Sequence, residues 1–190
     1  MSSIRIITIT GESATGKSTI AKALLDRLPG WTRANTGGKF REVCAEHGFS
    51  IQDVSTLPDE VHREIDSWQK SLAQNESHMI IEGRLAGWLT RDMPHVFRVY
   101  CETDLDVRVQ RYMKREGITS EHQSRKEITE RDHLDLLKYR KTYDLYDYRD
   151  PNYYNIRLDT SDRTPEALAQ SVLEQSGIAP QLTEDSSQRP

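Results

Sequence analysis

The sequence has only two cysteines, Cys44 and Cys101, and they lie far apart in the chain. Their separation fits neither a CxxC motif nor a metal-ligand spacing, so we expect two reduced thiols and no disulfide framework. The six histidines are scattered and form no HExxH motif, which excludes the common zinc patterns. The sequence therefore predicts no structural metal site.

Long apolar runs are also missing. No stretch approaches the length that spans a bilayer, and the first residues, MSSIRIITIT, lack the basic start and small-residue cleavage site of a signal peptide. We therefore expect a cytoplasmic protein with no membrane partner. With 35% hydrophobic and 29% charged residues in a chain of 190, the composition is typical of one soluble globular domain.

The chain lacks a basic excess, since its formal net charge at pH 7 is −4. Proteins that bind a nucleic-acid backbone usually carry positive charge, so we expect no nucleic-acid partner. Basic residues nevertheless outnumber acidic ones between Arg108 and Lys141, while the segment from Asp159 to Pro190 is acidic. A basic segment on an acidic protein favours small anionic ligands.

The clearest motif is GESATGKST at residues 11–19, which matches G-x-x-x-x-G-K-[ST]. The β-branched run before it predicts a strand, and apolar residues at helical spacing after it predict a helix. The backbone N–H groups of such a loop surround phosphate oxygens, the lysine reaches the outermost phosphates, and the hydroxyl can ligate Mg²⁺. We therefore predict a polyphosphate site formed by Gly11, Ser13, Ala14, Thr15, Gly16, Lys17, Ser18 and Thr19.

Strand and helix patterns alternate along the chain, which predicts an α/β fold with a parallel sheet and crossover helices. The expected strands are 4–10, 31–34, 78–82, 95–101 and 154–159. Helices are expected at 40–47, from Pro58 through Leu72, after a Thr103 N-cap up to Gly117, and at 165–175. Residues 118–131 are charge-dense and poor in apolar residues, so we expect a mobile, partly helical flap there and a loosely ordered tail after residue 178.

Two nucleotide-binding classes are disfavoured by what the sequence lacks. It contains neither DxxG nor NKxD, the elements with which a switch GTPase would recognise guanine and sense its phosphates. The chain is also too short for the additional domain of a mechanical ATPase. A phosphotransferase remains, and it needs an acceptor site with cations that offset transition-state charge.

Three stretches supply such cations. Arg41 follows Gly37 and Gly38, where the backbone can approach a ligand closely. Glu82 and Arg84 follow the apolar strand 79–81, at the carboxyl edge where α/β sites form, and Glu82 could order Mg²⁺ opposite Ser18. Arg108, Arg111 and Arg115 form a basic helical stripe that could equally be a solvated face, and we expect one or two of them to point at phosphate.

The segment TRANTGGKF, where the second expected strand meets the phosphate side, contains no acidic residue. Kinases that act on an alcohol generally position a carboxylate to accept the hydroxyl proton. A phosphate acceptor, with a second pKa of about 6, is already ionised at pH 7 and needs no base. The sequence therefore favours phosphate as the nucleophile.

These stretches together resemble the nucleoside monophosphate kinases, and specifically the cytidylate kinase-like branch. GESATGKSTIAKAL, TGGKFREVC, IDSWQ, IIEGRLAGW, VRVQRYMKREG, ITERD and YNIRLDTS follow the family's order over roughly residues 4–161. The EGRLAG stretch is the most specific and is similar to the short form of archaeal and related bacterial members. The resemblance implies a three-layer P-loop kinase fold with strand order 2-3-1-4-5, formed by a single domain over 1–178, with a monophosphate-binding region at about 36–75 and a lid at about 116–131.

The resemblance also implies roles for individual residues. Arg41, Arg84 and Arg131 would hold the acceptor phosphate and its sugar side, and Asp135 would contact the acceptor ribose. Arg111 and Arg115 would close on the transferring phosphoryl group, and Asp159 to Asp162, with Ser161, would lie beside the adenine of ATP. Lys39 and the EGRLAG form depart from the larger bacterial enzymes near the expected base pocket, so the choice of base stays open.

The hypothesis is that the protein transfers the γ-phosphoryl group of Mg²⁺·ATP to CMP or dCMP, giving ADP and the diphosphate. Lys17 would hold the β and γ phosphates, while Ser18 and Glu82 would place the metal. Two alternatives are a P-loop kinase of another small metabolite and a non-catalytic ATP-binding module. The expected partners are small-molecule nucleotides, and we expect a monomer.

Overall fold

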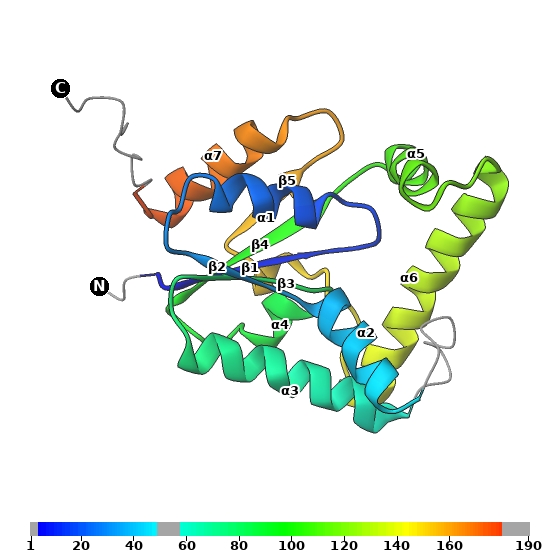
Figure 1. The fold of residues 1–190 in the computed structure, drawn as a ribbon, viewed down its shortest axis with the longest axis horizontal. Coiled ribbons are helices and arrows are strands. Elements are labelled where there is room, and N and C mark those ends of the chain that lie inside the picture. The colour runs from blue at the N-terminus through cyan, green and yellow to red at the C-terminus, as the bar shows by residue number, and fades with distance from the viewer. Residues whose placement is uncertain (1–3, 49–57, 180–190) are drawn as a thin grey trace.

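The computed structural model describes residues 4–48 and 58–179. Five parallel strands form one sheet in the order β2-β3-β1-β4-β5 (Figure 1), which confirms the predicted fold class and strand order. The strands are β1 Ile6–Gly11, β2 Thr32–Asn35, β3 Met79–Glu82, β4 Val96–Glu102 and β5 Ile156–Asp159. Each end lies within two residues of the expected range.

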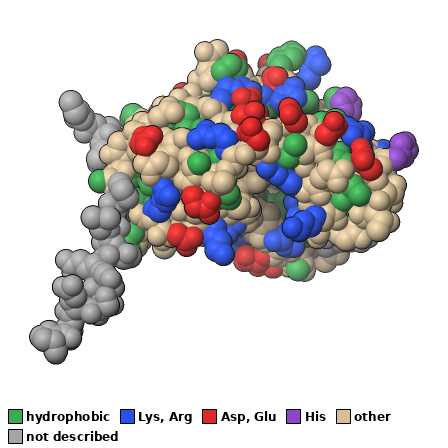
Figure 2. Space-filling view, turned by 90° about the horizontal axis from the view of Figure 1, so that it is seen from above, with side chains coloured by type: hydrophobic (Ala, Val, Ile, Leu, Met, Phe, Trp, Pro, Cys, Tyr) green, Lys and Arg blue, Asp and Glu red, His purple; other side chains and the backbone are tan. Residues whose placement is uncertain are grey.

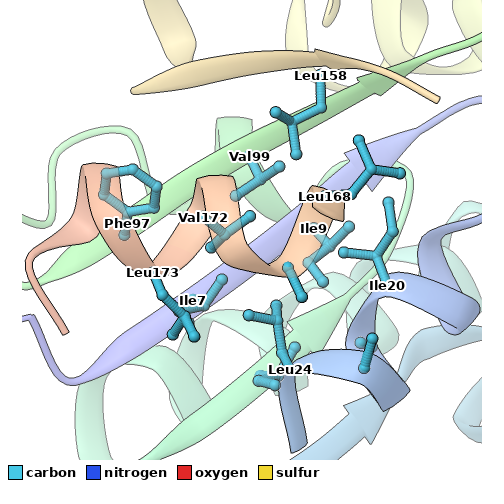
Figure 3. Packing of buried hydrophobic residues seen from close by; sticks show 14 of the residues in the cluster. Ile7, Ile9, Ile20, Leu24, Phe97, Val99, Leu158, Leu168, Val172 and Leu173 are labelled. Carbon is cyan, nitrogen blue, oxygen red and sulfur yellow. The ribbon is translucent and has the colours of Figure 1, made fainter. Parts of the chain in front are cut away.

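Side-chain alternation along β1 explains the three layers. Ile7 and Ile9 pack with α1 (Lys17–Leu25) and α7 (Pro165–Ser176) on one face of the sheet (Figure 3). Ile6 points to the other face and packs with residues of α3 (Asp59–Asn75) and α4 (Ala86–Leu89). Successive side chains of a strand point to opposite faces, so the apolar strand β1 contributes to the core on both sides of the sheet. Helices cover both faces (Figure 1).

The remaining helices lie beyond the carboxyl ends of the strands. They are α2 Thr36–Glu46, α5 Leu105–Glu116 and α6 Glu121–Tyr143. Helix α2 begins four residues before the expected start, because the Asn35 side chain accepts a hydrogen bond from Gly38 N at 3.0 Å and caps the helix. Helix α3 begins next to Pro58 as expected, and its apolar stripe is core packing.

The predicted N-cap at Thr103 is wrong. Asp104 occupies the N-cap position of α5, and the Thr103 hydroxyl instead hydrogen-bonds the Thr160 hydroxyl at 2.7 Å. The expected C-terminal stop is confirmed, because Gly117 adopts a left-handed conformation with φ of 69°. Helix α7 ends in the same way at Gly177.

The expected partly helical character of 118–131 is confirmed, since residues 118–120 lie outside any helix and residues 121–131 form the first part of one continuous helix of 23 residues. Ser120 caps it by accepting a hydrogen bond from Gln123 N at 3.2 Å. The sequence shows no apolar periodicity here because the buried face of α6 is largely polar. Its residues are Ser124, Ile128, Asp132, Asp135 and Tyr139. A pattern search for apolar residues misses such a face.

Two short elements were not expected from the sequence. They are α4 and the 3-10 helix η2 at Pro151–Tyr153, each shorter than the window over which periodicity is detectable. Residues 49–57 of the expected monophosphate-binding region, and residues 180–190 of the expected tail, lie outside the described residues. Within the described residues, none of the helices combines the length and the apolar character needed to cross a membrane.

We expect Leu24→Ala to lower the free energy of unfolding by about 2–5 kcal/mol, because Leu24 is fully buried between α1 and the sheet and its loss leaves a cavity. Leu137→Ala is the matched control, since Leu137 is 50% exposed on α6, and should change this free energy by less than about 0.5 kcal/mol. Urea denaturation followed by circular dichroism measures both. Equal losses in the two variants would contradict the assigned core.

Candidate active site

The glycine-rich loop connects β1 to α1 and has the geometry of a phosphate cradle. A side chain at Gly11 would lie 2.6 Å from the Cys101 carbonyl oxygen and 2.7 Å from Thr15 Oγ1, so only glycine fits this close approach. Gly16 is the N-cap residue of α1 and has φ of 81°, a left-handed conformation that glycine adopts without strain. The free N–H groups at the start of α1 therefore point into the loop, where anions bind favourably.

Lys17 lies folded against the loop. Its ammonium group donates hydrogen bonds to the carbonyl oxygens of Gly11 at 2.8 Å and Glu12 at 2.6 Å. Burial, together with the nearby positive charge of Arg84, lowers the pKa of Lys17 to about 7. The charges of Glu82 and Asp132 act in the opposite direction but do not offset the burial of this ammonium group, and a bound polyphosphate would add the negative charge that favours it.

Glu82, at the end of β3, faces Ser18 of the loop. The Ser18 hydroxyl donates to Glu82 Oε2 at 2.6 Å, and the Arg33 guanidinium of β2 pairs with Oε1. Serine and carboxylate oxygens are hard ligands of the kind Mg²⁺ prefers, and this ion usually takes one or two protein ligands beside waters and phosphates. The two residues predicted to place the metal therefore lie together and fit that ion, while Arg33 had no sequence signal.

Arg84 is buried beside the phosphate loop. Its guanidinium pairs with Asp132 at 2.9 Å and with Asp135, and it donates to the Ser13 hydroxyl. Burial opposes its charge, but the two carboxylates raise the pKa of Arg84 above its ordinary value. The cation of the EGRLAG stretch and the loop of the GESATGKST stretch therefore form one site.

Asp132 connects this site to α5. It also pairs with Arg108, which donates to the Ser13 carbonyl oxygen at 2.8 Å and pairs with Glu12 at 2.7 Å. Arg108 is only 5% exposed, so this member of the basic stripe is not a solvated face. Asp132 was not predicted as a site residue, and the only signal for it was the alternation of acidic and basic residues in ITERDHLD, at the end of the segment expected to be a flap.

Asp135 lies one turn beyond Asp132 on the same side of α6. Burial opposes its ionisation, yet the charges of Arg84 and Lys138 hold the pKa of Asp135 below its usual range. Lys138 Nζ approaches Asp135 Oδ1 at 3.3 Å and His62 Nδ1 of α3 at 3.4 Å. The residue predicted for the acceptor ribose is therefore at the site, held as an anion by its neighbours.

Arg111 and the segment after β5 meet on the opposite side of the loop. Arg111 donates to the Thr160 hydroxyl at 3.0 Å and to its carbonyl oxygen at 2.5 Å, and Thr160 in turn donates to the Thr15 carbonyl oxygen at 3.0 Å. Asp159 accepts from the backbone and hydroxyl of Ser161 at 2.9 and 2.6 Å. The residues predicted for the adenine side therefore lie next to the phosphate loop.

The other predicted arginines are not bound into these networks. Arg115 is 52% exposed at its side chain and pairs with Glu116. Arg41 and Arg131 are exposed and make no hydrogen bond or ion pair with the residues that the structure describes. Arg131 is within electrostatic reach of Arg84 and Arg115, and Arg41 lies about 4.0 Å from where a side chain at Gly37 would project.

Lys and Arg side chains border a hollow on the face of the molecule seen from above (Figure 2). The cations described here come from six elements and the loops that follow them: α1, β2, α2, β3, α5 and α6. Carboxylates pair with several of these cations, whereas the exposed Arg41 and Arg131 form no ion pair with the described residues, so this arrangement is suited to phosphate groups. Kinases use such cations to stabilise the charge of the transferring group.

The comparison with known families agrees with this geometry. The model of the cytidylate kinase-like family matches residues 35–162, a range that contains Glu82, Arg84, Arg111, Asp132 and Asp135. The chain belongs to the cytidylate kinase-like family.

Curated members of this family are similar over most of the chain. The cytidylate kinase of Natronomonas pharaonis is 29% identical over 188 residues, which are 97% of this chain and 95% of the relative. The cytidylate kinase of Methanocella arvoryzae is 32% identical and covers 82% of this chain and 87% of its own length. The similarity therefore includes the phosphate loop and the segments on both sides of the site.

Solved structures support the fold alone. An uncharacterized protein from Eubacterium ventriosum superposes with a TM-score of 0.68 at 18% identity, covering 92% of this chain and 99% of that chain. The shikimate kinase of Acinetobacter baumannii superposes with a TM-score of 0.58 at 16% identity, covering 91% and 93%. At these identities the shared feature is the P-loop kinase fold.

The pKa of Lys17 near 7 predicts that ATP binding takes up a proton. At pH 8 the free amine is mostly neutral, whereas bound phosphates favour the ammonium form, so up to about one proton should be absorbed on binding. Calorimetric titration in two buffers of different ionisation enthalpy measures this number. Lys17→Arg is the control, because a guanidinium stays protonated. Equal uptake in this variant would contradict the assignment to Lys17.

Proposed function

We propose that this protein is a nucleoside monophosphate kinase that transfers the γ-phosphoryl group of ATP to CMP or dCMP. The observation that carries the proposal is the contact of Arg84 with Ser13 in the phosphate loop. This contact brings Arg84, which we assign to the acceptor side, close to Lys17, which we assign to the donor side, in a member of the cytidylate kinase-like family. A donor and an acceptor phosphate can meet between them.

On the donor side, Lys17 and the N–H groups at the start of α1 hold the β and γ phosphates. Lys17 must leave the carbonyl oxygens of Gly11 and Glu12 to do so. Ser18 and Glu82 would hold Mg²⁺, which neutralises charge on the β and γ oxygens when bound. Arg111 stabilises the transferring group, and the segment around Asp159 and Ser161 lies beside the adenine.

On the acceptor side, Arg41, Arg84 and Arg131 bind the monophosphate, and Asp135 binds the ribose. Each carboxylate nearest the loop already has a partner: Glu82 pairs with Arg33, Asp132 with two arginines, and Asp135 with Arg84 and Lys138. A carboxylate engaged in this way is a weak proton acceptor. An acceptor that is ionised before it reacts fits this site, and a phosphate group is such an acceptor.

The proposal extends to the organisation of the protein. Residues 1–178 form the catalytic domain, with 36–75 binding the monophosphate and 116–131, including Arg131 and directly following Arg115, closing over the nucleotides. Closure would exclude water, which would otherwise compete as acceptor. All residues assigned to the site come from one chain, so a monomer suffices, and we place the enzyme in the cytoplasm.

A panel of nucleoside monophosphates tests the reaction in an ADP-release assay. We expect CMP and dCMP to stimulate ATP consumption and to be converted to diphosphates. Arg84→Ala should lower kcat/KM for CMP by about 10²–10³-fold, because a preorganised cation is lost from the transferring phosphates.

Arg27→Ala is the matched control, since Arg27 lies at the far end of α1 and hydrogen-bonds Gln170 of α7. It should leave kcat/KM unchanged. Stimulation by a hydroxyl compound but by no monophosphate would favour a kinase of another metabolite. ATP binding without transfer to any acceptor would favour a binding module.

A further inference from the structure

Asp66 is a half-buried carboxylate on α3, and the proposed phosphoryl transfer gives it no role. The Tyr143 hydroxyl of α6 donates to its Oδ2 at 2.6 Å, and the Gln69 side-chain amide donates to its Oδ1 at 3.2 Å. No Lys, Arg or His nitrogen forms an ion pair with it among residues 4–48 and 58–179. Asp66 is therefore held by neutral donors, unlike the other carboxylates of the site.

The face of α6 leads from the phosphate loop to Asp66. Asp132, Asp135 and Lys138 follow at intervals of three residues, which separates neighbours by about 4.5 Å along the helix axis. Asp132 lies against Ser13, and Lys138 reaches His62 on α3. Asp66 is one turn beyond His62 on the same side of α3. It accepts a hydrogen bond from Tyr143, the last residue of α6, so along α6 it lies at the end opposite to Asp132.

A nucleoside monophosphate can be aligned with this row of residues, because its phosphate is at one end and its base is at the other. Arg84 lies at the phosphate end, next to Ser13, and the proposed function assigns the ribose to Asp135. The next groups outward are Lys138 and Asp66, whose charges interact with each other and with Asp135. The base of the acceptor would therefore lie beside Asp66.

The surroundings of Asp66 disfavour its ionised form when no ligand is bound. Burial raises the pKa of Asp66 above its ordinary value, although the Tyr143 hydrogen bond and the Lys138 charge oppose this rise. A buried acid with no paired cation destabilises a protein unless it has a use. Its two oxygens offer about four acceptor positions, of which Tyr143 and Gln69 use two.

Gln69 adds a second acceptor nearby. It is 2% exposed, and its Oε1 has no hydrogen-bond partner among the described residues. This oxygen lies against Gly83, the residue before Arg84, where any side chain would collide with it. The Gln69 amide group, one helical turn from Asp66, thus helps to hold the carboxylate in place, while the remaining acceptor positions of Asp66 are unused among the described residues.

We infer that Asp66, supported by Gln69, recognises the base of the acceptor nucleotide and selects cytosine over uracil. This inference rests on the proposed function. The 4-amino group of cytosine is a hydrogen-bond donor, whereas uracil presents a carbonyl acceptor at the same position. The Asp66 carboxylate matches the amino group and repels the carbonyl oxygen, and a site built around such a hydrogen bond discriminates strongly.

The test compares CMP with UMP in wild type, Asp66→Asn and Glu60→Gln. We expect wild type to prefer CMP. In Asp66→Asn, an amide that can turn its NH₂ group toward a carbonyl oxygen should reduce the ratio of kcat/KM for CMP to that for UMP by about tenfold or more, with KM for ATP unchanged. Glu60→Gln, an exposed acid on α3 paired with Arg63, should leave the ratio unchanged.

Tyr143→Phe gives a second measurement that does not alter the charge. Loss of the hydroxyl frees Asp66 Oδ2 from its anchor, so the CMP preference should fall severalfold without a change in KM for ATP. This variant decides the matter if Asp66→Asn does not fold, as judged by its thermal transition.

A ratio that stays constant in folded Asp66→Asn, or in Tyr143→Phe, would overturn the inference. So would a wild-type enzyme that accepts CMP and UMP equally. Failure of the proposed function gives a different result, namely wild-type protein that phosphorylates no monophosphate at all.

Discussion

Asp132 holds two guanidinium groups, and the geometry of the whole site depends on that pairing. Arg84 reaches it from the turn after β3 and Arg108 from α5, while the carboxylate itself belongs to α6. Arg108 also binds the phosphate loop through Glu12 and the Ser13 carbonyl oxygen. Buried charges are tolerated only when they are paired and hydrogen-bonded. Three separate segments of the chain are therefore fixed around the loop by a single anion.

The cations of the site differ in how they are compensated. Arg84 and Arg108 have carboxylate partners inside the protein, and Lys17 is held in a setting that disfavours its charge. Arg41 and Arg131 have no such partner among the described residues. The buried arginines are therefore paired with carboxylates inside the protein, whereas the two exposed ones can bind an anion without giving up an ion pair. Such preorganised cations need no rearrangement during the reaction, which is a main source of catalysis.

The sheet and the phosphate loop were predictable because each follows from local sequence. Apolar runs marked the strands, and fixed spacing marked the loop. Ion pairs between distant residues leave no such pattern: Arg84 and Asp132 are 48 positions apart, so the anion between the two arginines was missed. Helix α6 was underestimated because its buried face is polar. The basic stripe was predicted as a unit, but Arg108, Arg111 and Arg115 have three different surroundings.

Helix α6 also links two ends of the nucleotide site mechanically. Its first turns pair with α5 through Arg125 and Asp106 at 2.8 Å, and its later turns present Asp135, Lys138 and Tyr143 toward the acceptor side. A continuous hydrogen-bonded helix moves largely as a rigid body. A small rotation of α6 about its last turns would therefore displace its first turns over a larger distance, so that contacts made at one end of the helix would be felt at the other.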